Sequence, residues 1–232
     1  MTLLVITQMA SDDQSQEHEL RSYGRRRSRK PSARQAALLR DDLPRLTFDP
    51  TAAPAEFSER WLEIGFGGGE HLLWQARQNP NVALIGCEPF EDGVIKVLTA
   101  IGDENLKNIR LHMGDVREIL RRVSPSSIDR AFILFPDPWP KRKHRKRRLV
   151  NESLLRLLAE AMRPGAELRI GTDIGDYART MLEAFATESR FIWQAASSED
   201  WRIRPSDWPE TRYEAKAVRE GRKRYYLRFL RA

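Results

Sequence analysis

The sequence has almost none of the residues from which disulfides and metal centres are built. Its 232 residues include one cysteine, Cys87, and four histidines without the spacing of metal ligands. A single cysteine excludes a disulfide within the chain, and we predict no metal site. Cys87 ends an apolar run, so we expect a small buried side chain rather than a reactive one.

Long apolar runs are also missing. No stretch approaches the roughly 20 uncharged residues that span a bilayer, and the first ten residues lack the basic start of a secretory signal. We therefore expect a cytoplasmic protein with no membrane partner.

Positive charge is in excess and is concentrated in segments. Forty Lys and Arg residues against 33 Asp and Glu residues give a net charge of +7. Seven of the eight residues at 141–148 are Lys or Arg, and a shorter basic arm covers residues 25–30. This distribution favours a polyanionic partner, although a basic segment can also be a solvated tail or a nuclear-localisation signal.

From residue 60 onward, short apolar runs alternate with amphipathic stretches. The runs predict strands at 61–64, 82–87, 109–113, 130–135 and 167–170, and the stretches predict helices at 70–78, 90–101, 116–123, 151–162 and 176–189. Such alternation is typical of an α/β Rossmann-like fold with a parallel sheet covered on both faces. Residues 191–195 and 224–230 alternate like half-exposed strands, which predicts an antiparallel pair without a helix of comparable length between them.

We predict three parts of the chain. Residues 1–22 are polar and aperiodic and are expected to be a disordered tail, residues 23–59 a basic extension, and residues 60–232 the catalytic domain. Within the extension, a short helix at 32–39 is expected to end before Pro44.

A glycine loop follows the first predicted strand, in the sequence Glu-Ile-Gly-Phe-Gly-Gly-Gly-Glu at 63–70. The dinucleotide-binding pattern G-x-G-x-x-G would place its third glycine at position 70, where Glu70 stands and would repel a pyrophosphate. The loop fits better as E-x-G-x-G-x-G, with Glu63 ahead of Gly65 and Gly67. S-adenosylmethionine carries no phosphate and two positive charges, so acidic neighbours suit it.

Further acids follow the later strands. Glu88 comes after 82–87, where a carboxylate can accept both ribose hydroxyls, and Asp115 comes after 109–113, where it can accept from the adenine amine. Asp115 alone could be a helix cap. Because the carboxyl ends of parallel strands meet at one edge of the sheet, these acids together predict an S-adenosylmethionine site.

The fourth strand leads into Pro-Asp-Pro-Trp-Pro at 136–140. Prolines on both sides of Asp137 restrict the backbone, so Asp137 and Trp139 would hold fixed directions. A carboxylate beside an aromatic ring suits a flat base, although a stiff turn around a buried Trp has the same pattern. The adjoining basic segment favours contact with RNA phosphates.

Together these motifs resemble the bacterial tRNA (guanine-N7)-methyltransferases over residue 23 to the C-terminus. The resemblance rests on the glycine loop, Phe-Pro-Asp-Pro-Trp-Pro-Lys with its basic run, Gly-Thr-Asp at 171–173, and Thr-Arg-Tyr-Glu at 211–214. Pro140 departs from the family, which commonly has His there. The fold implied is the seven-stranded class I methyltransferase sheet, mostly parallel with an antiparallel last strand.

The resemblance also implies roles for individual residues. S-adenosylmethionine would be bound by Glu63, Gly65, Gly67, Glu88, Asp115 and Asp137, and Asp137 would be the catalytic residue. The substrate base would be contacted by Lys141, Asp173, Thr211, Arg212, Tyr213 and Glu214. The tRNA backbone would be contacted by Lys143, His144, Arg145, Lys146, Arg147 and Arg148.

The expected activity is transfer of a methyl group to guanine N7 in tRNA, by a monomer or homodimer without an obligatory protein partner. Two alternatives stay open at this stage. One is a nucleic-acid methyltransferase acting on an exocyclic amine, because Asp-Pro-Trp is similar to the loop used there. The other is a non-catalytic RNA-binding protein on the same fold, which the complete set of strand-end acids disfavours.

Overall fold

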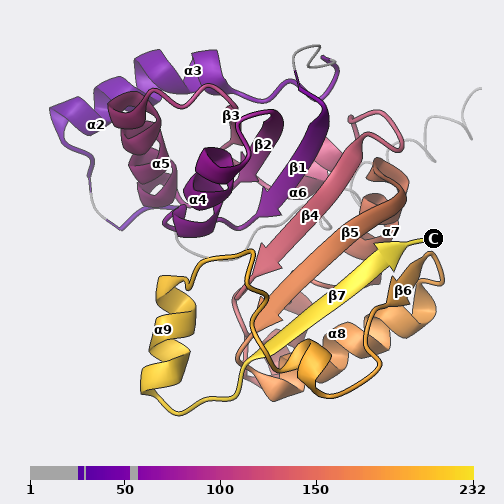
Figure 1. Cartoon of the computed structure of the whole chain (residues 1–232). Coiled ribbons are helices and arrows are strands. Elements are labelled where there is room, and N and C mark those ends of the chain that lie inside the picture. The colour runs from indigo at the N-terminus through magenta and orange to yellow at the C-terminus, as the bar shows by residue number, and fades with distance from the viewer. Residues whose placement is uncertain (1–25, 29, 53–56) are drawn as a thin grey trace, which may run out of the picture.

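The computed structural model describes residues 26–28, 30–52 and 57–232. In this part of the chain, seven strands form one sheet in the order β3-β2-β1-β4-β5-β7-β6 (Figure 1). The strands are β1 (Glu59–Ile64), β2 (Val82–Cys87), β3 (Ile109–His112), β4 (Ile128–Leu134), β5 (Met162–Thr172), β6 (Phe191–Trp193) and β7 (Tyr225–Arg231).

Strands β1 to β5 are parallel, and β7 runs antiparallel between β5 and β6. Thr172 at the end of β5 pairs with Tyr225 at the start of β7. The carboxyl ends of the parallel strands and the start of β7 therefore share one edge of the sheet. This topology confirms the predicted α/β methyltransferase sheet, including its antiparallel last strand.

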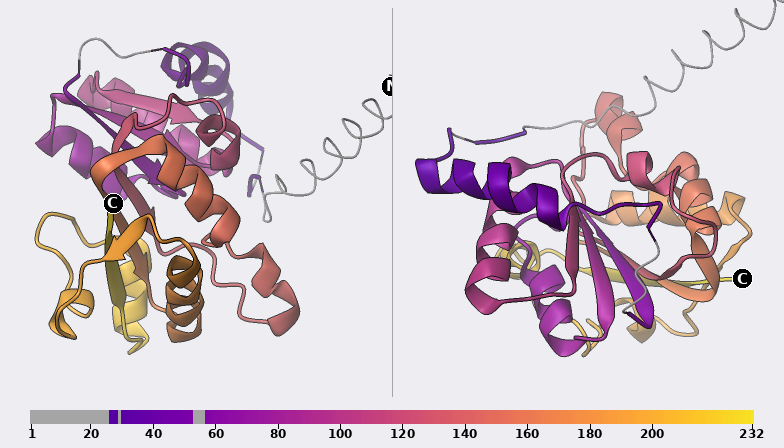
Figure 2. Two further views of the ribbon diagram at one scale, coloured as in Figure 1. Left: turned by 90° about the vertical axis from the view of Figure 1, so that its right-hand side faces the viewer. Right: turned by 90° about the horizontal axis from the view of Figure 1, so that it is seen from above.

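Helices cover both faces of the sheet (Figures 1 and 2). One face carries α4 (Glu70–Gln78) and α5 (Glu91–Glu104), and the other carries α6 (Val116–Leu120), α7 (Glu152–Ala161) and α8 (Gly175–Thr187). The core divides accordingly: Leu62 and Ile64 of β1 pack with α6, α7 and α8, whereas Trp61 packs with α4 and α5. This is the period of two expected of a strand buried on both faces.

Cys87 lies in this core with 1% of its surface exposed, as predicted. Burial raises the pKa of its thiol, so the side chain behaves as a small apolar group.

The helical segment before the sheet is longer than predicted. It passes from α2 (Ala33–Ala37) through a π-helical turn, η1 (Leu38–Asp42), into α3 (Leu43–Leu46), and it lies against α5 and β3. The prediction that it ends before Pro44 is wrong, because Pro44 stands in the first turn of α3, where its missing N–H is not needed.

A second prediction is wrong near the C-terminus. Between β6 and β7 lie a short turn, η3 (Glu199–Trp201), and a full helix, α9 (Arg212–Arg219), where no comparable helix was expected. Thr211 caps α9 by accepting from the backbone N–H of Glu214, at 3.2 Å.

The predicted tail at 1–22 lies outside the described residues, and so does part of the basic arm at 25–30. Within the described ranges, no helix is both long and apolar enough to cross a membrane. The division into tail, extension and catalytic domain stays a prediction.

Candidate active site

A cavity of about 1090 Å³ opens at the carboxyl ends of β1 to β4. The glycine loop, the β2–α5 and β3–α6 turns, the Pro-Asp-Pro-Trp segment and the basic segment all contribute to its walls. Five of the six residues predicted to bind the cofactor line it together: Gly65, Gly67, Glu88, Asp115 and Asp137.

The glycine loop takes a backbone conformation that other residues rarely adopt. Gly65 and Gly67 have φ of 74° and 55°, in the left-handed region. The N–H of Gly67 donates to Glu88 Oε2 at 2.7 Å, and the N–H of Phe90 donates to Glu88 Oε1 at 2.9 Å. Glu88 thus ties the loop to the end of β2.

The acids of this cavity differ in what surrounds them. Glu88 is buried, and burial raises its pKa against the effect of the two N–H donors, with Asp137 and Glu63 raising it further. Asp115 caps α6 and forms a two-pronged pair with Arg117, at 2.8 Å and 2.6 Å. The cavity therefore offers carboxylates of which only some are neutralised by protein cations.

Asp137 lies on a strained turn after β4. Phe135 and Trp139, two residues to either side of it, have φ of 52° and 42°, which for side chains of this size costs about 1–3 kcal/mol each. Asp137 lines the cavity, and partial removal of its carboxyl from water raises its pKa. Strain of this kind is common at functional sites and supports the importance of the turn.

Trp139 contacts the basic segment. The rings of Trp139 and His144 are nearly perpendicular, with centroids 5.8 Å apart, and the guanidinium of Arg147 lies 5.0 Å from the Trp139 ring centre. The basic segment forms a 3-10 helix, η2 (Arg142–Arg147), at the mouth of the cavity. The exposed residues of the segment are Lys141, Arg142, Lys143, Arg145 and Lys146, whereas Arg147 is half-buried.

The last residue of this segment is buried, contrary to the prediction. Arg148 has 4% of its surface accessible. Its side chain donates to Asp176 at 2.6 Å, Thr180 at 2.8 Å and the carbonyl of Pro138 at 3.1 Å. The expectation that the whole run is available to RNA is therefore wrong for Arg148, which attaches η2 to α8.

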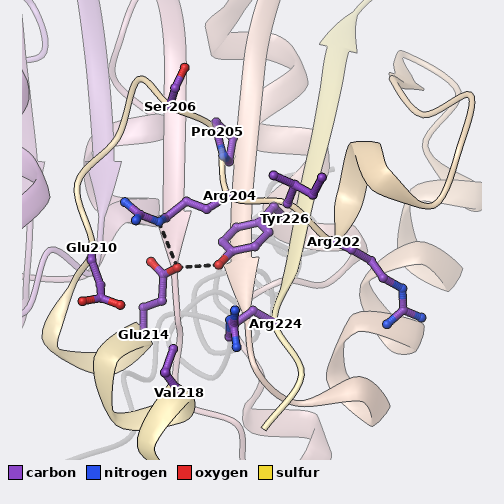
Figure 3. A pocket seen from close by; sticks show the side chains of 10 residues that line it. Arg202, Arg204, Pro205, Ser206, Glu210, Glu214, Val218, Arg224 and Tyr226 are labelled. Carbon is purple, nitrogen blue, oxygen red and sulfur yellow. Dashed lines mark hydrogen bonds and ion pairs between the residues drawn. The ribbon is translucent and has the colours of Figure 1, made fainter. Parts of the chain in front are cut away.

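A second cavity, of about 520 Å³, lies between the loop after η3, α9 and the start of β7 (Figure 3). Glu214 of α9 points into it with 2% of its surface exposed. It accepts from the hydroxyl of Tyr226 and pairs with Arg204 at 3.2 Å. Tyr213, the preceding residue, faces the first cavity, where its ring lies against Gly67.

Comparison with known proteins identifies the family of the chain. A family model described as "Putative methyltransferase" matches residues 58–227. A tRNA (guanine-N(7)-)-methyltransferase of Hyphomonas neptunium is 45% identical over 206 residues, which cover 86% of this chain and 94% of that protein. One of Rhodospirillum rubrum is 44% identical, covering 92% and 88%. The chain belongs to this methyltransferase family.

Solved structures agree on the fold of this methyltransferase. The 16S rRNA methyltransferase KamB matches with a TM-score of 0.54 at 16% identity, over 92% of this chain and all of that chain. The cyclase SpnF matches with a TM-score of 0.53 at 13% identity, over 87% and 84%. Family and fold together imply a bound methyl donor.

In this methyltransferase, other predicted site residues lie away from the first cavity. Glu63 points to the α4 face of the sheet, where His71 Nδ1 lies 2.7 Å from its carboxylate, and it is not part of the cavity wall. Asp173 pairs with Arg222 at 2.6 Å, and Arg212 pairs with Glu70. The described wall of this cavity also lacks Lys141 and Thr211, which is buried as the cap of α9.

Several residues that build the two sites are not among those predicted from the sequence. Arg117 holds Asp115, and Arg204 and Tyr226 hold Glu214. Asp115 and Arg117 are two residues apart, so their pairing was open to prediction. Arg204 and Tyr226 are brought to Glu214 only by the fold.

Proposed function

We propose that the protein transfers a methyl group from S-adenosylmethionine to N7 of a guanine in tRNA. The observation that carries this proposal is Asp137, held on a strained turn between a glycine-loop cavity and an exposed basic helix. The relatives named above as tRNA (guanine-N(7)-)-methyltransferases support the same substrate and position.

The residues of the first cavity fit such a cofactor. Gly67 has a positive φ that other residues rarely adopt, and a Cβ there would crowd the Tyr213 ring at 3.1 Å. The pKa values of Glu88 and Asp137 are raised because the protein withdraws both carboxyl groups from water, fully for Glu88 and partly for Asp137, so a cationic ligand without phosphate is favoured. Gly65, Gly67, Glu88 and Asp115 would hold the cofactor.

Methyl transfer to guanine N7 does not need a strong general base. When bound, the cofactor supplies an electrophilic methyl carbon on a sulfonium, whose sulfur keeps the electron pair of the broken bond. Guanine N7 has a lone pair and no proton, so positioning supplies most of the rate enhancement. Asp137 accepts hydrogen bonds from guanine N1–H and N2–H and balances the positive charge that the methylated base acquires.

The exposed part of the basic segment would bind the tRNA backbone. Lys143, Arg145 and Lys146 are exposed on η2 at the mouth of the cavity, where phosphates of a bound RNA can displace counterions. Because tRNA is cytoplasmic, we infer a cytoplasmic location. The monomer or homodimer state stays a prediction.

The decisive test compares Asp137→Asn with Asp103→Asn, an exposed control on α5. We expect Asp137→Asn to lower kcat on bulk tRNA by on the order of a hundredfold or more with little change in tRNA affinity. The control should behave as the wild type. Retention of activity within a few-fold would refute the role of Asp137.

Mass spectrometry of the nucleosides then tests the position of the methyl group. A methyl on N7 of guanosine is expected. A methyl on an exocyclic amine would refute the N7 assignment. No product together with no binding of adenosylhomocysteine in calorimetry would identify a non-catalytic RNA-binding protein.

A further inference from the structure

Only one oxygen of the Glu214 carboxylate has partners within the described part of the chain. Its Oε1 atom accepts from the Tyr226 hydroxyl and lies 3.2 Å from Arg204 Nε, as Figure 3 shows. Its Oε2 atom is buried and has no hydrogen-bond partner among the described residues. A buried carboxylate oxygen without a donor is costly, and such an atom calls for a ligand that supplies one.

The surroundings of Glu214 come from three elements. Arg204 and Glu210 face it from the loop before α9, Arg224 from the segment before β7, and Tyr226 from β7 itself. Burial raises the pKa of Glu214, and Glu210 raises it further, whereas the Tyr226 hydroxyl, Arg204 and Arg224 lower it. The hydroxyl of Tyr226 thus favours the ionised form and fixes its direction.

We propose that Tyr226 is a positioning residue, which fixes the Glu214 carboxylate so that Oε2 receives a hydrogen bond from the edge of an RNA base. This inference rests on the proposed function and deepens it. The second cavity is of a size common for small-ligand sites and is rimmed by Arg202, Arg204 and Arg224, so a nucleotide with its phosphate suits it. The start of β7 places Tyr226 at the same edge of the sheet as Asp137.

A purely structural role for Tyr226 is the competing explanation. Its ring packs against Trp208 at 5.5 Å between centroids and is 2% exposed. Tyr226→Phe keeps this packing and removes only the hydroxyl. Tyr225→Phe is the matched control, because Tyr225 stacks on Trp201 outside the second cavity.

We expect Tyr226→Phe to lower kcat on tRNA about tenfold, the usual loss when a hydrogen bond to a charged group is removed. Dissociation constants for tRNA and for adenosylhomocysteine should not change, since phosphates and the first cavity determine them. The acidic limb of the kcat profile should also move to higher pH, because loss of the hydroxyl raises the pKa of Glu214 and ionised Glu214 is then lost earlier as pH falls. A kcat and a pH profile equal to those of Tyr225→Phe would overturn the proposal.

A double-mutant cycle with Glu214→Gln tests whether Tyr226 acts through Glu214. Tyr226→Phe should have little further effect in the Glu214→Gln background, and an equal loss in both backgrounds would overturn the proposal. Carboxylate NMR, with Glu214 assigned from Glu214→Gln, gives a readout without activity. An unchanged Glu214 titration in Tyr226→Phe would overturn the positioning role, whereas absence of tRNA methylation by the wild type would refute only the proposed function.

Discussion

Gly93, in the first turn of α5, allows the glycine loop to approach that helix. A Cβ at Gly93 would lie 2.1 Å from the carbonyl oxygen of Gly67, about 1.3 Å short of an ordinary contact at 3.4 Å. The neighbour is backbone, so it cannot turn away as a flexible side chain would. Gly93→Ala must therefore displace Gly67, whose N–H holds Glu88.

Gly102 provides a matched control in the same helix. It is exposed, and a Cβ there would meet nothing within 4 Å. Both substitutions gain the helix propensity of alanine, up to about 1 kcal/mol. The difference between the variants is then the overpacking alone, so Gly93→Ala should unfold with about 1–3 kcal/mol less free energy than Gly102→Ala.

Two measurements check this reasoning. Urea unfolding followed by circular dichroism gives the free energies, and calorimetry with adenosylhomocysteine gives the affinity. Displacement of Gly67 should weaken binding about tenfold or more, which corresponds to roughly 1.4 kcal/mol. If both variants unfold at the same urea concentration and bind equally well, the contact between α5 and the glycine loop does not set the shape of the cavity.

Three further predictions concern charge. Arg148→Ala should lower Tm by about 5 °C, because it breaks a buried network. Lys143→Ala should leave Tm unchanged but lower the slope of log K for tRNA against log salt by about 0.9, and equal slopes would exclude a phosphate contact. Because the pKa of Asp137 is raised in the folded protein, its ionisation weakens folding as pH rises, so Asp137→Asn should melt higher than wild type at pH 7. The gain should vanish below the ordinary carboxyl pKa of 3.8, and a constant gain at all pH values would show that another effect causes it.

The sequence was sufficient for the parts of the fold that follow from local pattern. Alternating strands and helices predicted the parallel sheet, and acids directly after strands predicted that Glu88, Asp115 and Asp137 meet at one edge. Glu63 was assigned to the same cavity although it stands between Leu62 and Ile64. Strand alternation sends its side chain to the opposite face from theirs, toward α4.

Some features of the C-terminal region could not be predicted from local sequence patterns. Thr211 and Glu214 have the spacing of a helix cap, yet the polar sequence of α9 hid the helix that they begin. The capping geometry turns Tyr213 toward the first cavity and Glu214 toward the second. The partner of Arg148, Asp176, lies 28 positions later in the chain, so no local pattern indicates that Arg148 is held inside the protein.

The place of β7 in the sheet has a consequence for biosynthesis. Strand β6 leaves the ribosome well before β7, which is the only described strand that pairs with it. One edge of β5 also stays unpaired until β7 has been synthesised. Until then the growing chain exposes unsatisfied backbone groups, which favour aggregation. A nonsense mutation that removes the final strand would therefore leave a chain that chaperones or proteases must handle, even though the glycine loop and Asp137 are intact.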